Sequence, residues 1–416
     1  MENKHVSLAP GIWRAVLQLT PSTITPNKKG QPLDDKVGLK FDEATAGELP
    51  FALDIKYTSD SVFSIDIING DERLTIPAED IKIGRDRATA RDTILINFSI
   101  FGSYVRGVFQ ERVLEGEWVV PAKNLSIPFV ARYGQGHRFT TLNKTPKADL
   151  TGKWACSFDL ENEKPYAAVA ELKQNGNILR GTFRTETGDY RFLDGEVQDN
   201  KFYLSCFDGA HAFLFEGKIV NNDSIVGVFR SGKTGREIWS GNRNPNADLR
   251  DANSLTTVKS EQINFTFPDT DGKKISLNDY AGKVKLVQIM GTWCPNCRDE
   301  TRFLTEYLTK NGSEKLTVVA LAFERNAEIA VAQTRNYKAK MAVPYDILIA
   351  GTSTSKEEAA KTLPFLSQVV AFPTLIFIDK NNRVRRVHTG FDGPATSRHA
   401  AFASEFDTFV KKLVSE

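Results

Sequence analysis

Apolar and polar residues alternate along about the first 250 residues of the chain, in short runs that turn-forming residues separate. Such runs occupy residues 51–57, 62–68 and 93–100, where every second side chain is apolar. Alternation with a period of two is typical of strands that have one buried and one exposed face. This part of the chain therefore predicts an antiparallel all-β structure.

The β region contains an internal repeat. A Gly-x-Trp triplet opens each copy, at Trp13 and at Trp154. Further along, a Gly-Val-Phe run precedes Trp118 in the first copy and Trp239 in the second. Four of the five tryptophans therefore bracket two units of related sequence. We expect each unit to be a curved sheet that needs a partner surface to bury one face.

These patterns divide the chain into four segments. We expect a first β unit at residues 1–146 and a second at 147–247, with the option that the two pack as one domain. The first unit carries an additional segment, about 21–48, whose Pro, Lys, Gly and Asp content predicts a long loop. Residues 248–260 predict a linker, and 261–416 a separate domain.

The last 160 or so residues alternate between strand and helix patterns, which indicates an α/β domain. The runs 284–290 and 316–323 are apolar on both faces, as in strands inside a sheet with helices on each side. Helical patterns cover about 295–310 and 326–340. The final helix carries one apolar stripe, which includes Phe402, Phe406, Phe409 and Leu413.

Composition and charge exclude two broad classes of function. The chain of 416 residues is 41% hydrophobic and 25% charged, with a net charge of +2, and its basic residues are interspersed with acidic ones. We therefore expect no nucleic-acid partner. The longest apolar runs fall short of the roughly 20 residues of a membrane span. Residues 1–10 lack the apolar core of a secretory signal, so either the protein stays inside the cell or a signal has been removed.

Two of the four cysteines form a Cys-Pro-Asn-Cys motif, at Cys294 and Cys297, between a strand and a helix. Backbone N–H groups at the start of a helix favour a thiolate at Cys294, and Pro295 suits the first helical position. Cys297 is one helical turn further on and can attack a mixed disulfide formed at Cys294. Trp293 is expected to shield one side of the pair. A zinc site is the alternative, but no further cysteine pair or nearby histidine supplies its remaining ligands.

Glu300 is the candidate proton carrier for this pair. It lies three residues before Phe303 and four before Leu304, on the apolar face of the same predicted helix. A carboxyl group there is desolvated, its pKa is raised, and it can exchange protons with Cys297. The alternative is a surface glutamate that complements the helix dipole.

The segment from about 261 to 416 resembles the thioredoxin-fold domain of the TlpA/ResA-like thiol–disulfide oxidoreductases. The resemblance rests on Trp293-Cys-Pro-Asn-Cys297, on Ala371-Phe-Pro-Thr374 before an apolar strand, and on the entry segments 265–273 and 277–283. The repeated β region followed by such a domain is similar to multidomain envelope proteins of Bacteroidetes-type bacteria. The fold class implied is multidomain: all-β with two repeated antiparallel units, then an α/β thioredoxin-like domain.

This resemblance implies roles for several residues. A glutamate at the place of Glu300 occurs in the ResA-like group. Pro373 matches the family's cis-proline, which presents the backbone of Phe372 for pairing with an extended substrate. Many thioredoxins carry an acid six residues before the first cysteine, where this chain has Gln288. The Pro-Asn dipeptide also departs from better-known members, which place proline second, and this leaves the redox direction open; the family's usual role favours a reductant.

The resemblance also implies partners and a compartment. The substrates are protein thiols and disulfides, an unidentified donor supplies electrons, and no cofactor is needed beyond the redox-active Cys294–Cys297 disulfide. The expected place is the periplasm or cell envelope, with a lipid tether lost along with a removed signal as one option and the cytoplasm as the alternative.

Two other functions and one disulfide stay open. A thiol peroxidase on the same fold is disfavoured, because Gly291 and Val287 stand where peroxiredoxins have Thr or Ser and Pro. A binding or scaffold protein whose β repeats are the main working part is the second alternative. Cys156 and Cys206 both face inward in the strand pattern, and they are either free thiols or a disulfide.

Overall fold

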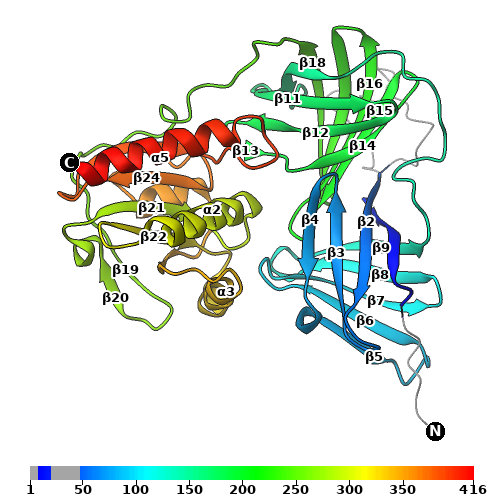
Figure 1. Ribbon diagram of the computed structural model, residues 1–416, viewed down its shortest axis with the longest axis horizontal. Helices are drawn as coiled ribbons and strands as arrows, with labels where there is room; N and C mark the ends of the chain where they lie inside the picture. The colour runs from blue at the N-terminus through cyan, green and yellow to red at the C-terminus, as the bar shows by residue number, and fades with distance from the viewer. Residues whose placement is uncertain (1–7, 20–46) are drawn as a thin grey trace. The chain divides into compact units, whose positions relative to one another are not determined.

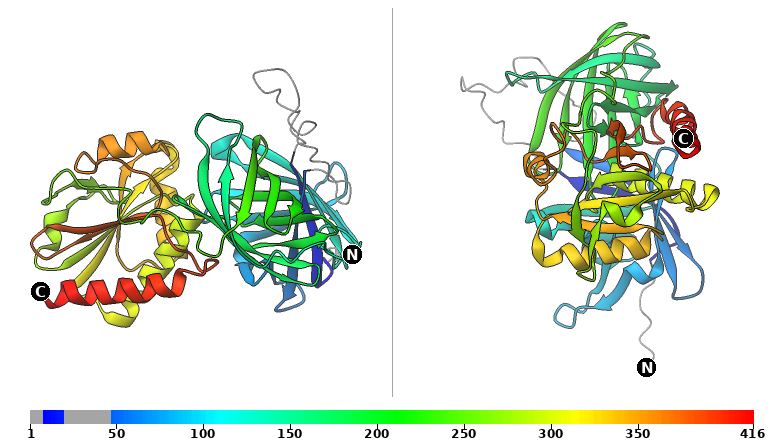
Figure 2. Two further views of the ribbon diagram at one scale, coloured as in Figure 1. Left: turned by 90° about the horizontal axis from the view of Figure 1, so that it is seen from above. Right: turned by 90° about the vertical axis from the view of Figure 1, so that its left-hand side faces the viewer.

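The computed structural model describes residues 8–19 and 47–416. The long loop expected at about 21–48 therefore lies almost entirely outside the described residues. The chain forms two compact units. One ends at Asp248 and leaves out residues 184–189, and the other combines 184–189 with 249–416. Figures 1 and 2 show strands throughout the first unit and a mixture of strands and helices in the second.

The N-terminal unit contains two antiparallel sheets, and the first has the order β4-β3-β2-β1-β9-β8-β7-β6-β5. Neighbouring strands in it are antiparallel, beginning with β1 and β2, where Gly11 pairs with Ile55. Its elements are β1 (Gly11–Gln18), β2 (Glu48–Tyr57), β3 (Phe63–Asn69), β4 (Glu72–Ile76), η1 (Ala78–Asp80), β5 (Ile81–Arg85), β6 (Asp92–Phe98), β7 (Ser103–Gln110), β8 (Val113–Val120), η2 (Pro121–Lys123) and β9 (Leu125–Tyr133).

The second sheet has the order β11-β10-β18-β17-β16-β15-β14-β12-β13, and an additional β11–β12 pairing closes it into a barrel. Its strands are β10 (Gly152–Phe158), β11 (Tyr166–Asn175), β12 (Ile178–Thr185), β13 (Gly188–Asp189), β14 (Leu193–Gln198), β15 (Lys201–Phe207), β16 (Ala212–Asn221), β17 (Ser224–Ser231) and β18 (Gly235–Arg243). The predicted antiparallel all-β region is confirmed.

The repeat is visible in the topology of both sheets. In each copy the first strand lies between the second strand and the last, as β1 does between β2 and β9 and β10 between β11 and β18. The opening tryptophans also make the same hydrogen bond four residues back. Trp13 Nε1 donates to the carbonyl oxygen of Ala9 at 2.8 Å, and Trp154 Nε1 donates to that of Leu150 at 3.0 Å.

The equivalence drawn from sequence between the second pair of tryptophans is wrong by one strand. Trp118 lies on β8, the last but one strand of the first sheet, whereas Trp239 lies on β18, the last strand of the second. Adjacent strands of an antiparallel sheet share the same apolar alternation, so a short motif also matches when it is displaced by one hairpin.

The two copies differ in closure. In the second sheet β12 pairs with β14, from Ile178↔Glu196 to Gly181↔Leu193. Counted from the start of each copy, the corresponding strands of the first sheet are β3 and β5. Within the described residues these two strands do not pair, and the sheet stays open between its edge strands β4 and β5. The first copy is thus a half-barrel with an apolar inner face.

The outer face of the closed barrel covers this apolar face. Phe207 at the end of β15 inserts its ring among residues of the half-barrel: its centroid lies 4.5 Å from that of Phe51, 5.5 Å from Phe98 and 5.1 Å from Trp118. Other barrel residues belong to the same hydrophobic core, and they are Tyr203, Ala210, Ala212 and Leu214. The expectation that each unit needs a partner surface is confirmed for the first copy.

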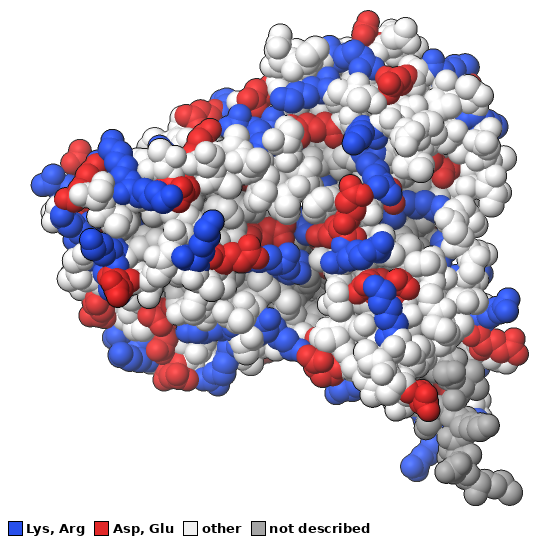
Figure 3. Space-filling view, in the orientation of Figure 1, with Lys and Arg blue, Asp and Glu red and all other residues white. Residues whose placement is uncertain are grey.

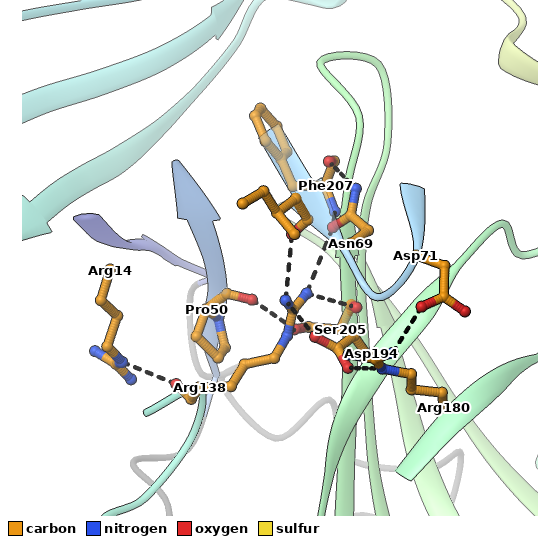
Figure 4. Close-up of polar contacts among 10 residues, drawn as sticks. Arg14, Pro50, Asn69, Asp71, Arg138, Arg180, Asp194, Ser205 and Phe207 are labelled. Carbon is orange, nitrogen blue, oxygen red and sulfur yellow. Dashed lines mark hydrogen bonds and ion pairs between the residues drawn. The ribbon is translucent and has the colours of Figure 1, made fainter. Parts of the chain in front are cut away.

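Polar contacts around Arg138 also join the two copies (Figure 4). Its guanidinium lies 3.0 Å from the Asp194 carboxylate and donates to the Ser205 hydroxyl and carbonyl oxygens, both at 3.0 Å. Ser205 in turn donates its hydroxyl to the carbonyl oxygen of Pro50 at 2.5 Å. A guanidinium with this many acceptors is well compensated for burial, so the cluster fixes how the copies pack.

The C-terminal unit contains a mixed sheet in the order β23-β22-β21-β24-β25, with β24 antiparallel to β21. The predicted α/β thioredoxin-like architecture is confirmed. Its elements are β19 (Thr266–Pro268), β20 (Lys274–Ser276), η3 (Leu277–Tyr280), β21 (Val284–Met290), α2 (Pro295–Asn311), β22 (Leu316–Phe323), α3 (Ala327–Lys340), β23 (Asp346–Gly351), α4 (Lys356–Thr362), β24 (Thr374–Ile378), β25 (Val384–Thr389) and α5 (His399–Ser415).

Two segments join this unit that the sequence pattern assigned elsewhere. Residues 249–260, expected as a linker, belong to the C-terminal unit, where Thr256 accepts a hydrogen bond from Thr389 and Val258 bridges to Leu366. Residues 184–189, which comprise the end of β12, the following turn and β13, also belong to it. Both segments are polar in sequence, and only their contacts reveal where they pack.

The described surface agrees with the balanced composition. Figure 3 shows Lys and Arg side chains interspersed with Asp and Glu across the face in view. Among the described residues, no helix is both long and apolar enough to cross a bilayer.

We predict that Arg138→Met lowers the free energy of unfolding of the β region by about 3 kcal/mol, because it leaves buried acceptors and part of Asp194 unpaired. Arg180→Met is the matched control, since Arg180 also pairs with Asp194 but its side chain is 44% exposed; its cost should stay below about 1 kcal/mol. Denaturant unfolding followed by hydrogen exchange in β15 measures both. Equal costs for the two variants would contradict the role given to Arg138.

Candidate active site

The cysteine pair lies where β21 turns into helix α2. Cys294 is the N-cap residue, and its sulfur accepts a hydrogen bond from the backbone N–H of Cys297 at 3.3 Å. The Cys294 side chain is 7% exposed, whereas Cys297 is fully buried. Burial and the neighbouring Cys294 sulfur raise the pKa of the Cys297 thiol well above its usual range. The two cysteines are therefore unequal: Cys294 caps the N-terminus of α2 and keeps a small exposed fraction, whereas Cys297 is completely enclosed.

A buried carboxylate holds the turn that carries Cys294. Glu324, directly after β22, accepts a hydrogen bond from the Thr292 backbone N–H at 3.0 Å and another from its hydroxyl at 2.8 Å. Burial raises the pKa of Glu324, and the Thr292 donors oppose that rise. Sequence reasoning missed this residue. The available signal was its place after a parallel strand next to β21, where side chains reach the same sheet edge.

Trp293 is locked by three neighbours beside the pair. Its indole N–H donates to the Phe323 carbonyl oxygen at 2.9 Å, and its ring meets that of Phe372 edge to face at 5.7 Å. The Arg325 guanidinium carbon lies 5.0 Å from the indole centroid. Arg325 was also missed from sequence. Its Nε is buried without a hydrogen-bond partner among the described residues, and its charge is within electrostatic reach of Cys294.

Phe372 and Pro373 lie on the other side of Cys294. The peptide bond between them is cis, as the resemblance implied. The Cys294 sulfur lies 3.5 Å from the Phe372 carbonyl oxygen, and the Pro373 carbonyl oxygen accepts a hydrogen bond from the Gly390 N–H at 2.9 Å. The structure therefore brings Trp293, Cys294, Phe372 and Pro373 together, as the sequence predicted.

Glu300 points into the protein from the second turn of α2. Its side chain is fully buried, and its Oε2 accepts a hydrogen bond from Gln288 Nε2 at 2.9 Å. Burial raises the pKa of Glu300 to about 8, and the Gln288 donor limits that rise. Of the two placements considered from sequence, the buried apolar face is the observed one. Gln288 was treated only as a missing acid, and its contact with Glu300 was not foreseen.

The dipeptide between the cysteines is covered within the same compact unit. Pro295 begins α2, and its side chain is buried. Asn296 donates from Nδ2 to the carbonyl oxygen of Asp189 at 3.3 Å. Gly188, at a φ of +134°, leaves no room for a Cβ against the Asn296 amide. Residues 184–189 thus pack on the variable part of the motif, which no sequence signal marked.

The arrangement suits stepwise chemistry of sulfur. An accessible sulfur on a helix N-terminus serves as nucleophile, an enclosed sulfur one turn later serves to resolve the product, and a buried carboxyl on the same helix exchanges protons. A peptide backbone at Phe372 lines the approach to the first sulfur.

Comparison with known proteins agrees with this geometry. The model of the Redoxin family matches residues 257–403. This segment is a redoxin domain. The thiol–disulfide oxidoreductase ResA of Bacillus thuringiensis subsp. konkukian is 30% identical to it over 128 residues, which are 30% of this chain and 66% of that relative. The thioredoxin-like protein YneN of Bacillus subtilis is 29% identical over 126 residues, which are 30% of this chain and 68% of that relative.

The chain thus spans slightly less than two thirds of the length of these ResA proteins. Solved structures are similar over the same region. A thiol:disulfide interchange protein of the thioredoxin family from Chlorobium tepidum is 22% identical, with a TM-score of 0.30, and the match covers 40% of this chain and 99% of that one. A secreted thiol–disulfide isomerase from Corynebacterium glutamicum is 18% identical, with a TM-score of 0.31, covering 41% and 97%.

We predict that alkylation of the reduced protein at neutral pH labels Cys294 alone, because it caps the N-terminus of α2, whereas burial raises the pKa of the Cys156, Cys206 and Cys297 thiols. Arg325→Gln should slow this labelling roughly threefold or more, since it removes a cation that favours the thiolate. Arg302→Gln removes an exposed charge from α2 and serves as the control. Labelling rates followed by mass spectrometry decide. Equal rates in both variants would remove Arg325 from the redoxin site.

We predict that Glu300→Gln gains stability over the wild type as pH rises from about 5 to 8. The folded state keeps the Glu300 proton up to a pKa of about 8, whereas an unfolded glutamate loses it near pH 4.3. Stability from this group is therefore complete at low pH and is lost through that window, by a few kcal/mol. Urea unfolding at pH 5 and pH 8 measures the difference, with exposed Glu306→Gln as control. A difference that is independent of pH would show that Glu300 ionises normally.

Proposed function

We propose that this protein reduces disulfides of a partner protein in the cell envelope through Cys294 and Cys297. The observation that carries the proposal is the inequality of the two cysteines: Cys294 caps α2 and is 7% exposed, whereas Cys297 is completely enclosed. The match of residues 257–403 to the redoxin family supports it. The exchange needs no cofactor beyond this pair.

The reaction proceeds in two substitutions. The Cys294 thiolate attacks one sulfur of the partner disulfide, a mixed disulfide forms, and the other partner sulfur leaves as a thiolate. Cys297 then loses its proton and attacks the Cys294 sulfur, which releases the second partner thiol. Two electrons pass to the partner, and the Cys294–Cys297 disulfide remains. A separate dithiol donor, not identified by the sequence or the structure, returns the protein to its reduced form.

Glu300 serves the second substitution. Cys297 has a strongly raised pKa and cannot attack until a base accepts its proton. Glu300 is buried on the same helix, within electrostatic reach of Cys297, and its pKa of about 8 makes its carboxylate a stronger base than an ordinary glutamate. Resolution should therefore accelerate as pH rises through about 8, where the carboxylate form accumulates.

Phe372 and Trp293 serve the binding of substrate. The backbone of Phe372 lies next to the Cys294 sulfur and fits an extended segment of the partner by main-chain pairing. The face of Trp293 is fixed by Arg325 and Phe372, so it offers a rigid wall to the side chain beside the partner's cysteine. The envelope as compartment rests on the similarity to ResA-like proteins.

A recognition role for the β region is the second candidate. Barrel residues complete the hydrophobic core of the half-barrel, and the two form one large compact unit, which a reductase of general thiols does not require. In this version the β region selects the partner, and the redoxin domain performs the exchange.

We predict that the full-length Cys297→Ser variant accumulates its partner as a mixed disulfide on Cys294, because resolution is blocked after the first substitution. The matched control is the Cys294→Ser/Cys297→Ser variant, which should capture nothing covalently. Non-reducing electrophoresis with identification of the captured protein measures this. Capture that persists in the double variant would disprove exchange through Cys294, and non-covalent recovery of the same partner with it would assign recognition to the β region.

A further inference from the structure

Gln288 is a polar side chain in the middle of an apolar central strand. It lies on β21, between β22 and β24, and its side chain is fully buried. Burying a primary amide costs free energy unless its N–H and C=O groups find hydrogen-bond partners. An apolar residue would fill this place in the sheet without that cost, so the partners of Gln288 indicate what the amide does.

All of its partners belong to the helix that carries the cysteines. Gln288 Nε2 donates to Glu300 Oε2 at 2.9 Å and lies 3.3 Å from the carbonyl oxygen of Cys297. Gln288 Oε1 accepts a hydrogen bond from the Thr301 hydroxyl at 3.2 Å. The amide thus joins the resolving cysteine's backbone, the candidate base and the following residue into one cluster.

A further hydroxyl fixes the orientation of the amide. Tyr337 on α3 is fully buried, and its hydroxyl lies 3.0 Å from Thr301 Oγ1. Burial raises the pKa of Tyr337 well above its usual range, so its phenol stays protonated and donates a hydrogen bond to Thr301 Oγ1. Thr301 then donates to Gln288 Oε1, and Nε2 is left to face Glu300. The chain of donors runs in one direction and ends on the carboxyl group.

We propose that Gln288 is a positioning residue for proton transfer, which holds Glu300 by one carboxyl oxygen and leaves the other available to the Cys297 thiol. Glu300 Oε1 is buried and has no hydrogen-bond partner among the described residues, as this role requires. The inference rests on the proposed exchange through Cys294 and Cys297. It gives a task to the residue that stands where many thioredoxins carry their buried acid.

The surroundings of Glu300 make this one donor important. The titratable groups that face it include Cys297 on α2 and Tyr345 ahead of β23, and both of these are neutral in their protonated forms. Burial raises the pKa of Glu300, and the hydrogen bond from Gln288 is the contact that opposes the rise. The amide therefore influences both the orientation of the carboxyl group and the pH at which it becomes a base.

The full-length reduced protein and an aromatic disulfide that releases coloured thionitrobenzoate test the proposal. The first release reports attack by Cys294, and the second reports resolution by Cys297. In Gln288→Met, which keeps side-chain length but lacks the donor, the midpoint of the second phase should move upward by roughly 0.5–1 pH unit. The first phase should keep its pH dependence. Tyr337→Phe, which removes the distal donor only, should cause a smaller shift in the same direction.

A double variant separates positioning from general packing. If Gln288 acts through Glu300, the pH profile of Gln288→Met/Glu300→Gln should equal that of Glu300→Gln alone. A Gln288→Met profile with the wild-type midpoint, or a further shift in the Glu300→Gln background, would overturn the proposal. Absence of the second release in the wild-type protein would instead disprove the proposed exchange. Should Gln288→Met not fold, Thr301→Val, which frees the amide to rotate, must show the same upward shift.

Discussion

Among the described residues, no cation lowers the pKa of Glu300, although the carboxyl group of this residue on the cysteine-bearing helix α2 is completely buried. A buried carboxyl group without a positive partner stays protonated far above its usual pH. Everything around the cysteine pair is compatible with this constraint: the resolving thiol is also neutral and buried, and the contacts to the carboxyl group come from an amide rather than from a salt bridge. The low-dielectric interior thus raises the pKa of both groups, so each of them holds its proton at neutral pH and the carboxyl group becomes a base only as pH rises.

The two cysteines have different surroundings, with Cys297 on the inner side of the pair and Cys294 on the outer side. Inside, Gln288, Thr301 and Tyr337 supply a directed series of donors. On the outer side of the pair, the Cys294 sulfur lies beside the backbone carbonyl oxygen of Phe372 and interacts electrostatically with the Arg325 guanidinium. Glu324 ties the connecting turn to the end of β22, so the accessible sulfur is placed by a buried carboxylate and the enclosed one by a buried amide. Polar groups in the core here determine position, because each one has only a single set of partners that satisfies it.

Sequence reasoning found those parts of this site that depend on local order. The strand, turn and helix around Cys294, the buried face of Glu300 and the pairing of Phe372 with Pro373 all follow from residue spacing or from the family motif. Glu324 and Arg325 were missed because their contact with Thr292 and Trp293 arises from the parallel register of β21 and β22, which sequence spacing does not specify. Residues 184–189 were missed for a related reason, since their contacts lie more than a hundred positions away in the chain. From sequence, Gln288 is only an uncharged residue where many thioredoxins have an acid, whereas the role proposed for it depends on its amide N–H donor.

In the β region the repeat was recognisable, but the unequal closure of its copies was not. Both copies have the same strand order, and the decisive difference is whether the third and fifth strands pair. The unclosed copy has an apolar inner face, and apolar residues on the outer surface of the closed copy, which are Tyr203, Phe207 and Leu214, cover that face. The closed copy therefore has its own core and also supplies residues to the core of the half-barrel. The hydrogen bonds of Arg138 to Ser205 fix how the two copies pack. A barrel surface that fills the half-barrel in this way is fixed by packing, so its residues cannot vary independently of the half-barrel side chains that they contact, such as Phe51, Phe98 and Trp118.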